Sequence, residues 1–178
     1  MSELWKQSAV DVVGLLRSGE ISPVEAVQAA IERIEAVDSK TNALPIRCFD
    51  RAIERAQTLD LTGHRQNPKS LCGLPIAVKD YNDVAGVRTT YGSPIFKDHI
   101  AERSDVTVAV LEHNGANPIA KSNVPEWAGG HTFNPVNGLT CNPWNLSRSA
   151  GGSSGGSAAA LASGQVWLAT GNDLGGSL

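Results

Sequence analysis

Residues 73–80 read Gly73-Leu74-Pro75-Ile76-Ala77-Val78-Lys79-Asp80, a short apolar run that ends in a charged pair. An uninterrupted apolar run of this length is typical of a strand that is buried on both faces. Further strand patterns occur at 118–120 and 166–170, and helix patterns occur at 105–114 and from the glycine-rich loop at 151–156 to about residue 162. Strands that alternate with helices predict a layered α/β fold.

The first third of the chain has mainly helical patterns. Ser8 with Asp11 predicts one helix start, and Ser22-Pro23-Val24-Glu25 predicts a stronger one, with serine as the cap and proline in the first turn. We expect an extended segment over 42–49, a helix over 51–59 and a polar loop over 63–70. No linker separates this mainly helical region, residues 1–70, from the α/β core at 71–178.

Composition limits the class of protein. The 178 residues are 41% hydrophobic and 19% charged, with a net charge of −3 and no basic block, which argues against nucleic-acid binding. The N-terminus has no signal-peptide pattern, and no apolar run approaches the roughly 20 residues that span a bilayer. The cysteines, Cys48, Cys72 and Cys141, are odd in number and widely spaced, which favours a reducing compartment. We therefore expect a cytoplasmic globular protein.

Lys79 is the first candidate for chemistry because it follows a buried strand. Burial disfavours the charged form and lowers the pKa of a lysine from about 10.4, and a neutral lysine can act as a general base. The alternative is a lysine that reaches solvent or pairs with Asp80 or Asp83. The residue type alone favours that alternative.

Two glycine- and serine-rich loops supply the other candidates. Gly151-Gly152-Ser153-Ser154-Gly155-Gly156 could bring hydroxyls and N–H groups to one point, bind an anion at the following helix, or act as a flexible linker. Asp173-Leu174-Gly175-Gly176-Ser177 puts a hydroxyl beside backbone N–H donors, as acyl transfer requires, but it would also suit a tight turn. The four histidines have no metal-ligand spacing with one another or with the cysteines, so no metal site is expected.

Taken together, these segments resemble the amidase signature family. The resemblance runs from about Trp5 to the last residue and rests on the order and spacing of five blocks: 73–80, Lys121-Ser122-Asn123-Val124-Pro125-Glu126-Trp127, Asn142-Pro143-Trp144-Asn145, Gly151-Gly152-Ser153-Ser154-Gly155-Gly156-Ser157, and Gly171-Asn172-Asp173-Leu174-Gly175-Gly176-Ser177.

The resemblance implies a Ser-cis-Ser-Lys triad. Ser177 matches the family's nucleophile, Lys79 matches its base, and Ser153 matches the bridging serine, 24 positions before the nucleophile and preceded by a cis peptide bond. The N–H groups of Leu174, Gly175, Gly176 and Ser177 would form the oxyanion hole. Ser154 and Asp173 would support the loops, and Gly129, His131 and Thr132 would lie near the substrate. No metal or organic cofactor is implied.

The resemblance also implies an α/β/α architecture with a mixed central sheet. Residues 1–178 would be the N-terminal portion of one amidase signature domain, because members of the family run to several hundred residues. A polypeptide of only these residues is expected to be inactive and prone to aggregation, with exposed apolar sheet faces. Two positions depart from the family pattern: Leu178 replaces the usual isoleucine, and Asn172 stands where threonine or serine is more usual.

Three functions remain open at this point. The first is a stand-alone hydrolase that acts on a small or aromatic amide, with a homodimer allowed for the full-length protein. The second is the amidase-type subunit of the glutamyl-tRNA amidotransferase, which releases ammonia from glutamine within a complex. The block 123–127 has the hydrolase form and favours the first. The third, an anion-binding module, leaves Lys79 unexplained.

Overall fold

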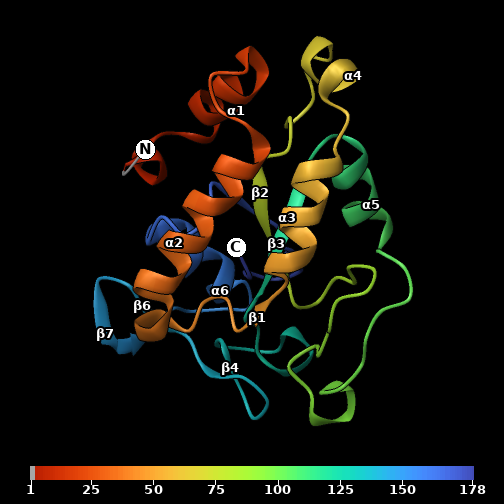
Figure 1. Ribbon diagram of the computed structural model, residues 1–178. Helices are drawn as coiled ribbons and strands as arrows, with labels where there is room; N and C mark the ends of the chain where they lie inside the picture. Colours follow the sequence, from red (N-terminus) through yellow and green to blue (C-terminus); the bar gives the residue numbers. More distant parts are fainter. Residues whose placement is uncertain (1–2) are drawn as a thin grey trace.

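The computed structural model describes residues 3–178, and its centre is a mixed sheet of four strands in the order β1-β3-β2-β8 (Figure 1). The strands are β1 (Ile46–Arg47), β2 (Pro75–Lys79), β3 (Asn117–Ser122) and β8 (Leu168–Ala169). β2 runs parallel to both β3 and β8, whereas β1 pairs antiparallel with β3. The expected mixed α/β architecture is therefore confirmed.

Two capped helices begin where the sequence predicted. In α1 (Ala9–Ser18) and α2 (Pro23–Thr41), Ser8 and Ser22 each accept the N–H of the acidic residue three positions later, and that residue accepts the serine N–H in return. Such a reciprocal pair satisfies two N–H groups that the first turn leaves free. α3 (Phe49–Thr58) follows β1 directly and begins two residues before the predicted position.

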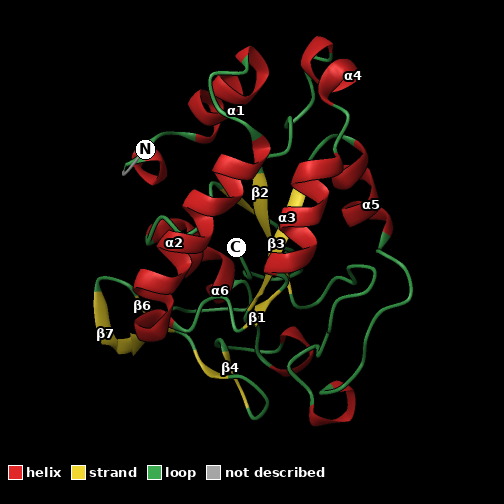
Figure 2. Cartoon of the chain, viewed as in Figure 1, coloured by secondary structure: helices red, strands yellow, loops and turns green. Residues whose placement is uncertain are grey.

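Helices cover both faces of the sheet (Figure 2). One core combines apolar side chains of α2, α3 and α6 (Gly155–Ala162) with Ala77 and Ile119 of the sheet. On the other face, Ile76 and Val78 pack against Val108 of α5 (Val106–His113) and against Val84 and Val87. Because successive residues of a strand point to opposite faces, β2 contributes to both cores.

Some local predictions were wrong. The expected loop over 63–70 overlaps the end of α4 (Leu61–Gln66), which forms because Asp60 caps its first turn and Leu61 packs against the core formed with α1. The helix predicted over 105–114 is shorter: α5 has Asp105 at its N-cap position, and the hydroxyl of the preceding Ser104 donates to Glu112. Two short ladders were not predicted: β4 (Phe133–Asn134) with β5 (Gly138–Leu139), and β6 (Cys141–Asn142) with β7 (Asn145–Ser149).

Three short 3-10 helices complete the described chain: η1 (Leu4–Lys6), η2 (Pro94–Phe96) and η3 (Glu126–Ala128). None of the helices within residues 3–178 has the length and apolar character needed to cross a membrane. β8 lies at the edge of the sheet, and the apolar side chains of Leu161, Leu168, Leu174 and Leu178 are exposed nearby.

Candidate active site

Lys79 lies at the end of β2, where three segments meet. Its backbone N–H donates to Thr170 Oγ1 at 2.8 Å, which fixes the loop after β8 against the strand. In the ladder between β2 and β3, Lys79 pairs with Ser122. The Ser122 hydroxyl in turn bonds Ser157 of α6 at 2.6 Å, so the side of the sheet that carries Lys79 faces α6.

The Lys79 ammonium has no exposed surface and is surrounded by oxygen atoms. Its Nζ lies 2.8 Å from Ser153 Oγ and 2.8 Å from Ser154 Oγ, and it contacts Asn172 Oδ1 as well as the Asn172 carbonyl at 3.4 Å. Burial lowers the pKa of Lys79 to about 8, a change that the Asp173 carboxylate partly opposes. A substantial fraction of this lysine is therefore neutral near physiological pH.

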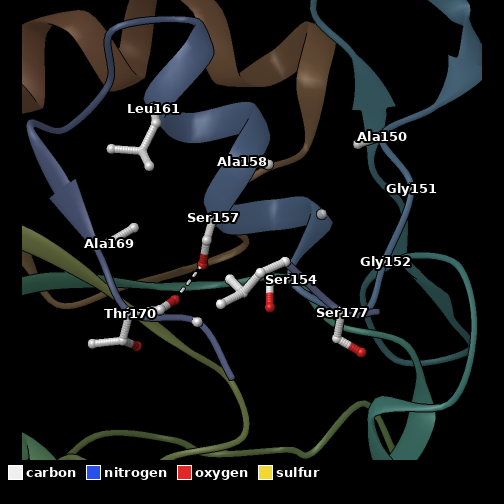
Figure 3. Close-up of a pocket in the computed structure, with 13 residues that line it drawn as sticks. Ala150, Gly151, Gly152, Ser154, Ser157, Ala158, Leu161, Ala169, Thr170 and Ser177 are labelled. Carbon is white, nitrogen blue, oxygen red and sulfur yellow. Dashed lines mark hydrogen bonds between the residues drawn. The ribbon is translucent and has the colours of Figure 1, made fainter. Parts of the chain in front are cut away.

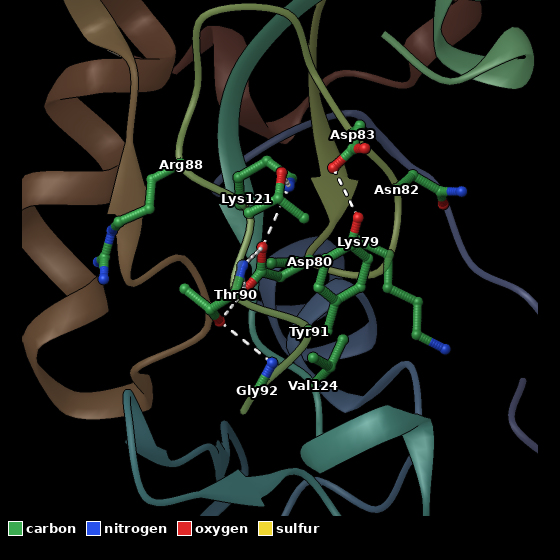
Figure 4. Close-up of polar contacts among 12 residues, drawn as sticks. Lys79, Asp80, Asn82, Asp83, Arg88, Thr90, Tyr91, Gly92, Lys121 and Val124 are labelled. Carbon is green, nitrogen blue, oxygen red and sulfur yellow. Dashed lines mark hydrogen bonds and ion pairs between the residues drawn. The ribbon is translucent and has the colours of Figure 1, made fainter. Parts of the chain in front are cut away.

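Lys79 does not pair with Asp80 or Asp83. Asp80 Oδ1 lies 3.1 Å from Lys121 Nζ, and both side chains are completely buried. Asp83 Oδ1 accepts the Tyr91 hydroxyl at 2.9 Å. Figure 4 shows the Lys79 side chain directed away from this polar cluster. The alternative of a lysine held by a neighbouring carboxylate is therefore excluded.

The loop before α6 presents Ser153 and Ser154 to Lys79. A cis peptide bond joins Gly152 and Ser153. Both serines are at most 4% exposed. The adjacent backbone is close to its neighbours: a Cβ at Gly155 would lie 2.3 Å from Thr132 Oγ1, and one at Gly156 would lie 2.3 Å from the Asn123 nitrogen. Glycine is required here because no larger residue allows such an approach.

Ser177 is partly exposed in the loop that follows β8, and its carbonyl accepts the Ser154 N–H at 3.2 Å. Asp173 holds this loop, since its carboxylate accepts the N–H groups of Gly176 at 2.5 Å and Leu178 at 3.0 Å. Backbone N–H donors of this loop lower the pKa of Asp173. Within residues 3–178 no hydrogen bond joins the Ser177 hydroxyl to Ser153.

Two hollows meet at Ser177. One has a volume of about 310 Å³ and is lined by Ser153 and Ser177 together with the rings of Tyr81 and Trp127. The other, of about 400 Å³, lies beneath α6 and is lined by Ser154, Ser177 and small or apolar residues (Figure 3). The two serine hydroxyls next to Lys79 thus each border a space that also reaches Ser177.

Aromatic rings form one wall of the smaller hollow. Trp127 is 49% exposed and stacks on Tyr91, with ring centroids 5.7 Å apart and planes 11° from parallel. Tyr91 also meets Tyr81 edge to face at 6.0 Å. The Tyr91 carbonyl accepts the Trp127 N–H at 2.9 Å, and this bond fixes the turn in which Trp127 has a φ of 52°. A flat substrate group would find an aromatic surface here.

The residues expected near the substrate lie beside the serine loop and do not line the two hollows that reach Ser177. Thr132 is fully buried, and its hydroxyl accepts the Gly155 N–H at 3.1 Å, so it supports the serine loop. Gly129 and His131 are exposed, and neither lines the two hollows that reach Ser177. Among the four predicted oxyanion-hole residues, the Leu174 side chain is fully exposed, and the Gly176 N–H is bound to Asp173.

Several residues at the site were missed by sequence reasoning. Lys121 ends an apolar run in the same way that Lys79 does, and this repeated pattern could have marked it as a second buried lysine. Its pairing with Asp80 follows only from the strand register. Asn172 was noticed only as a departure from the family pattern. Nothing in the sequence placed Tyr81 beside Trp127, because the two rings meet through tertiary packing.

No group of three or more histidine, cysteine, aspartate or glutamate side chains able to hold a metal occurs in the part of the chain that the structure describes. The candidate site brings together a lysine amine with a lowered pKa, hydroxyls, an amide and backbone donors. These groups can transfer protons and attack a carbonyl carbon.

Comparison with known proteins gives consistent matches. A family model described as Amidase matches residues 25–178. The indoleacetamide hydrolase of Bradyrhizobium diazoefficiens is 40% identical over 177 residues, and a glutamyl-tRNA(Gln) amidotransferase subunit of Oleidesulfovibrio alaskensis is 37% identical over 179 residues. The alignments cover 98% and 100% of this chain.

Solved structures agree with the sequence matches. A bacterial aryl acylamidase of the amidase signature enzymes superposes with a TM-score of 0.81 at 34% identity and covers 90% of this chain and 34% of its own. The chain spans only 34% of the length of the indoleacetamide hydrolase and 37% of that of the amidotransferase subunit.

Proposed function

Because this chain belongs to the amidase signature family, we propose that the protein carrying it hydrolyses a carboxylic amide through an acyl-enzyme, with Lys79 as base, Ser153 as relay and Ser177 as nucleophile. The observation that carries the proposal is the fully buried Lys79 amine, 2.8 Å from the Ser153 hydroxyl and hydrogen-bonded to no carboxylate of residues 3–178. Residues 1–178 would then be the N-terminal portion of one domain, with residues 1–70 mainly helical and the core at 71–178.

The proposed reaction begins with proton transfer. Neutral Lys79 accepts the Ser153 proton while Ser153 accepts the proton of Ser177, and the Ser177 oxygen forms a bond to the amide carbon. The carbon–nitrogen bond then breaks, and the relay returns the proton to the departing ammonia or amine. Water attacks the resulting ester by the same relay and releases the acid.

Stabilisation of the oxyanion is assigned to the loop of Leu174, Gly175, Gly176 and Ser177. This assignment is supported by the backbone N–H groups of Gly175, Gly176 and Ser177, which act on the Asp173 carboxylate and lower its pKa. Asp173 and Ser154 keep a supporting role: the first orders the nucleophile loop and the second contacts Lys79. For the transition state to use the Gly176 N–H, Asp173 must release it.

The substrate class that the smaller hollow favours is an amide with a planar group. Tyr81 and Trp127 border the same space as Ser153 and Ser177. Two relatives support this choice by their names, an indoleacetamide hydrolase and an aryl acylamidase. Gly129 and His131 could touch only a larger substrate, since both lie outside the hollow.

The amidotransferase subunit is the second candidate, and the observation in its favour is the 37% identity over the whole chain. That function would require partner proteins and a tRNA-bound acceptor, whereas the hydrolase requires only a small-molecule amide. Glutaminase assays distinguish the two: ammonia release from glutamine at a rate above that from aryl amides would favour the subunit, and the reverse order of rates would favour the hydrolase. We also propose a cytoplasmic location, which the free thiols of Cys48, Cys72 and Cys141 support.

A serine-directed fluorophosphonate tests the main proposal. We expect covalent label on Ser177, located by mass spectrometry of the protein that carries residues 1–178. Lys79→Ala should abolish the label, whereas Lys97→Ala, which removes a 63%-exposed lysine, should retain it. Label on another serine, or undiminished label in the folded Lys79→Ala variant, would contradict the assignment.

A further inference from the structure

Lys79 leaves an ambiguity that its distances alone do not resolve. Its Nζ is 2.8 Å from Ser153 Oγ and also 2.8 Å from Ser154 Oγ. A neutral amine has two N–H bonds and one lone pair, so only one of these hydroxyls can donate its proton to the lysine. Some other group must decide which serine receives an N–H and which one faces the lone pair.

We propose that Asn172 makes this choice and is a positioning residue for the proton relay, an inference that rests on the function proposed above. Asn172 makes three contacts at the site, and two of them carry the inference: its backbone carbonyl accepts the Ser154 hydroxyl at 3.4 Å, and its side-chain oxygen Oδ1 accepts an N–H of Lys79. The third is the long contact of 3.4 Å between Lys79 Nζ and the same carbonyl.

The first contact removes Ser154 from the relay. Since the Ser154 hydrogen points to the Asn172 carbonyl, the Ser154 oxygen is left to accept an N–H from Lys79. Ser153 has no such acceptor: within the described residues its hydroxyl bonds only to Lys79 Nζ. The Ser153 proton is therefore the one that is free to move to the amine.

The second contact uses the remaining N–H. With one N–H on Ser154 and the other on Asn172 Oδ1, the lone pair of neutral Lys79 points to Ser153. The amide oxygen only accepts hydrogen bonds, whereas a threonine or serine hydroxyl could turn and donate to the lone pair. An amide is also uncharged, so it orients the amine without stabilising the ammonium form as a carboxylate would.

The charged groups around Lys79 explain why an uncharged side chain at position 172 matters for the protonation of the amine. Asp173 is the carboxylate that acts on Lys79 from the loop after β8. Directly after β2, Asp80 is bound to Lys121 and Thr90, and Asp83 accepts the Tyr91 hydroxyl. In the described chain no carboxylate is hydrogen-bonded to the amine, so a charge added at position 172 would be the strongest new influence on the protonation of Lys79.

Asn172→Asp tests the inference because it changes the charge and almost nothing of the shape. The readout is the rate constant for fluorophosphonate labelling of Ser177 as a function of pH. In the wild type this rate should rise with pH through a midpoint near 8, since neutral Lys79 is the active form. In Asn172→Asp the carboxylate favours the ammonium, so the midpoint should move up by about one to three pH units.

The variant should therefore label about tenfold or more slowly at pH 7 and recover at high pH, which a merely structural defect would not do. Asn145→Asp, which adds a carboxylate on exposed β7, should keep the wild-type midpoint. A folded Asn172→Asp variant whose midpoint equals that of the wild type would overturn the inference. Absence of Ser177 labelling in the wild type would instead refute the proposed function.

Asn172→Leu provides a second test that adds no charge. It removes the side-chain acceptor while keeping a similar volume, so the lysine is no longer held in one orientation. We expect labelling to be at least about tenfold slower at every pH, with no upward movement of the midpoint. Labelling as fast as in the wild type would overturn the inference, whichever result Asn172→Asp gives.

Discussion

Lys121→Met should destabilise the protein more than its conservative shape suggests. Lys121 and Asp80 are both 0% exposed, with Nζ and Oδ1 3.1 Å apart, and Lys121 also donates to Thr89 Oγ1 at 2.7 Å. Burial lowers the pKa of Lys121, and the Asp80 carboxylate opposes that change. The pair joins the end of β2 to β3 and to the loop that carries Thr89 and Thr90.

The expected loss of stability follows from the hydrogen-bond partners that remain to Asp80 in the variant. Without Lys121 the buried carboxylate retains, among residues 3–178, only the N–H and hydroxyl of Thr90. Removing one partner of a buried ion pair costs about 3–5 kcal/mol, because an uncompensated charge stays in the interior. Lys97→Met is the matched control, since its pair with Asp98 is 3.9 Å long and exposed, and it should cost less than about 1 kcal/mol.

Urea unfolding of the protein that carries residues 1–178 measures both losses. The double variant Asp80→Asn/Lys121→Met removes the charge as well as its partner, so it should be more stable than Lys121→Met alone. A Lys121→Met variant no less stable than Lys97→Met would refute the reasoning. So would a double variant less stable than the single one.

Two further predictions concern the loop before α6 and the aromatic wall. Gly156→Ala should lower the free energy of unfolding by about 1–3 kcal/mol or more, because its Cβ would lie 2.3 Å from the Asn123 nitrogen. Gly175→Ala is the control: its Cβ would meet open space, so this variant should melt near the wild-type temperature. Equal melting temperatures of the Gly156→Ala and Gly175→Ala variants would contradict the close approach of Gly156 to Asn123. Trp127→Ala should raise KM for an aryl amide by about two- to tenfold, which corresponds to the free energy of one aromatic pair, and should raise KM for a small aliphatic amide less. Trp144→Ala is the control, since Trp144 is 80% exposed, and it should change KM for neither substrate. If KM for an aryl amide is unchanged in Trp127→Ala, the aromatic wall does not take part in substrate recognition.

Local signals determined much of the fold. The caps at Ser8 and Ser22, the buried strand before Lys79 and the helix at 155–162 all follow from short segments whose side chains satisfy their own backbone or form one apolar face. The short ladders at 133–149 were not predicted, because their pairing depends on distant residues such as Asn42, which donates to the carbonyls of Asn137 and Leu139.

The sequence by itself therefore determined most of the helices, the buried strand and the family, while the tertiary structure decided what each polar group does. Lys79 and Lys121 follow similar apolar runs, yet the register pairs Lys79 with Ser122 and Lys121 with Val78. Because neighbouring residues of a strand point to opposite faces, one lysine reaches the serines near α6 and the other reaches Asp80 on the far side. Strand register arises from packing across the whole sheet, so no local pattern could have told the two lysines apart.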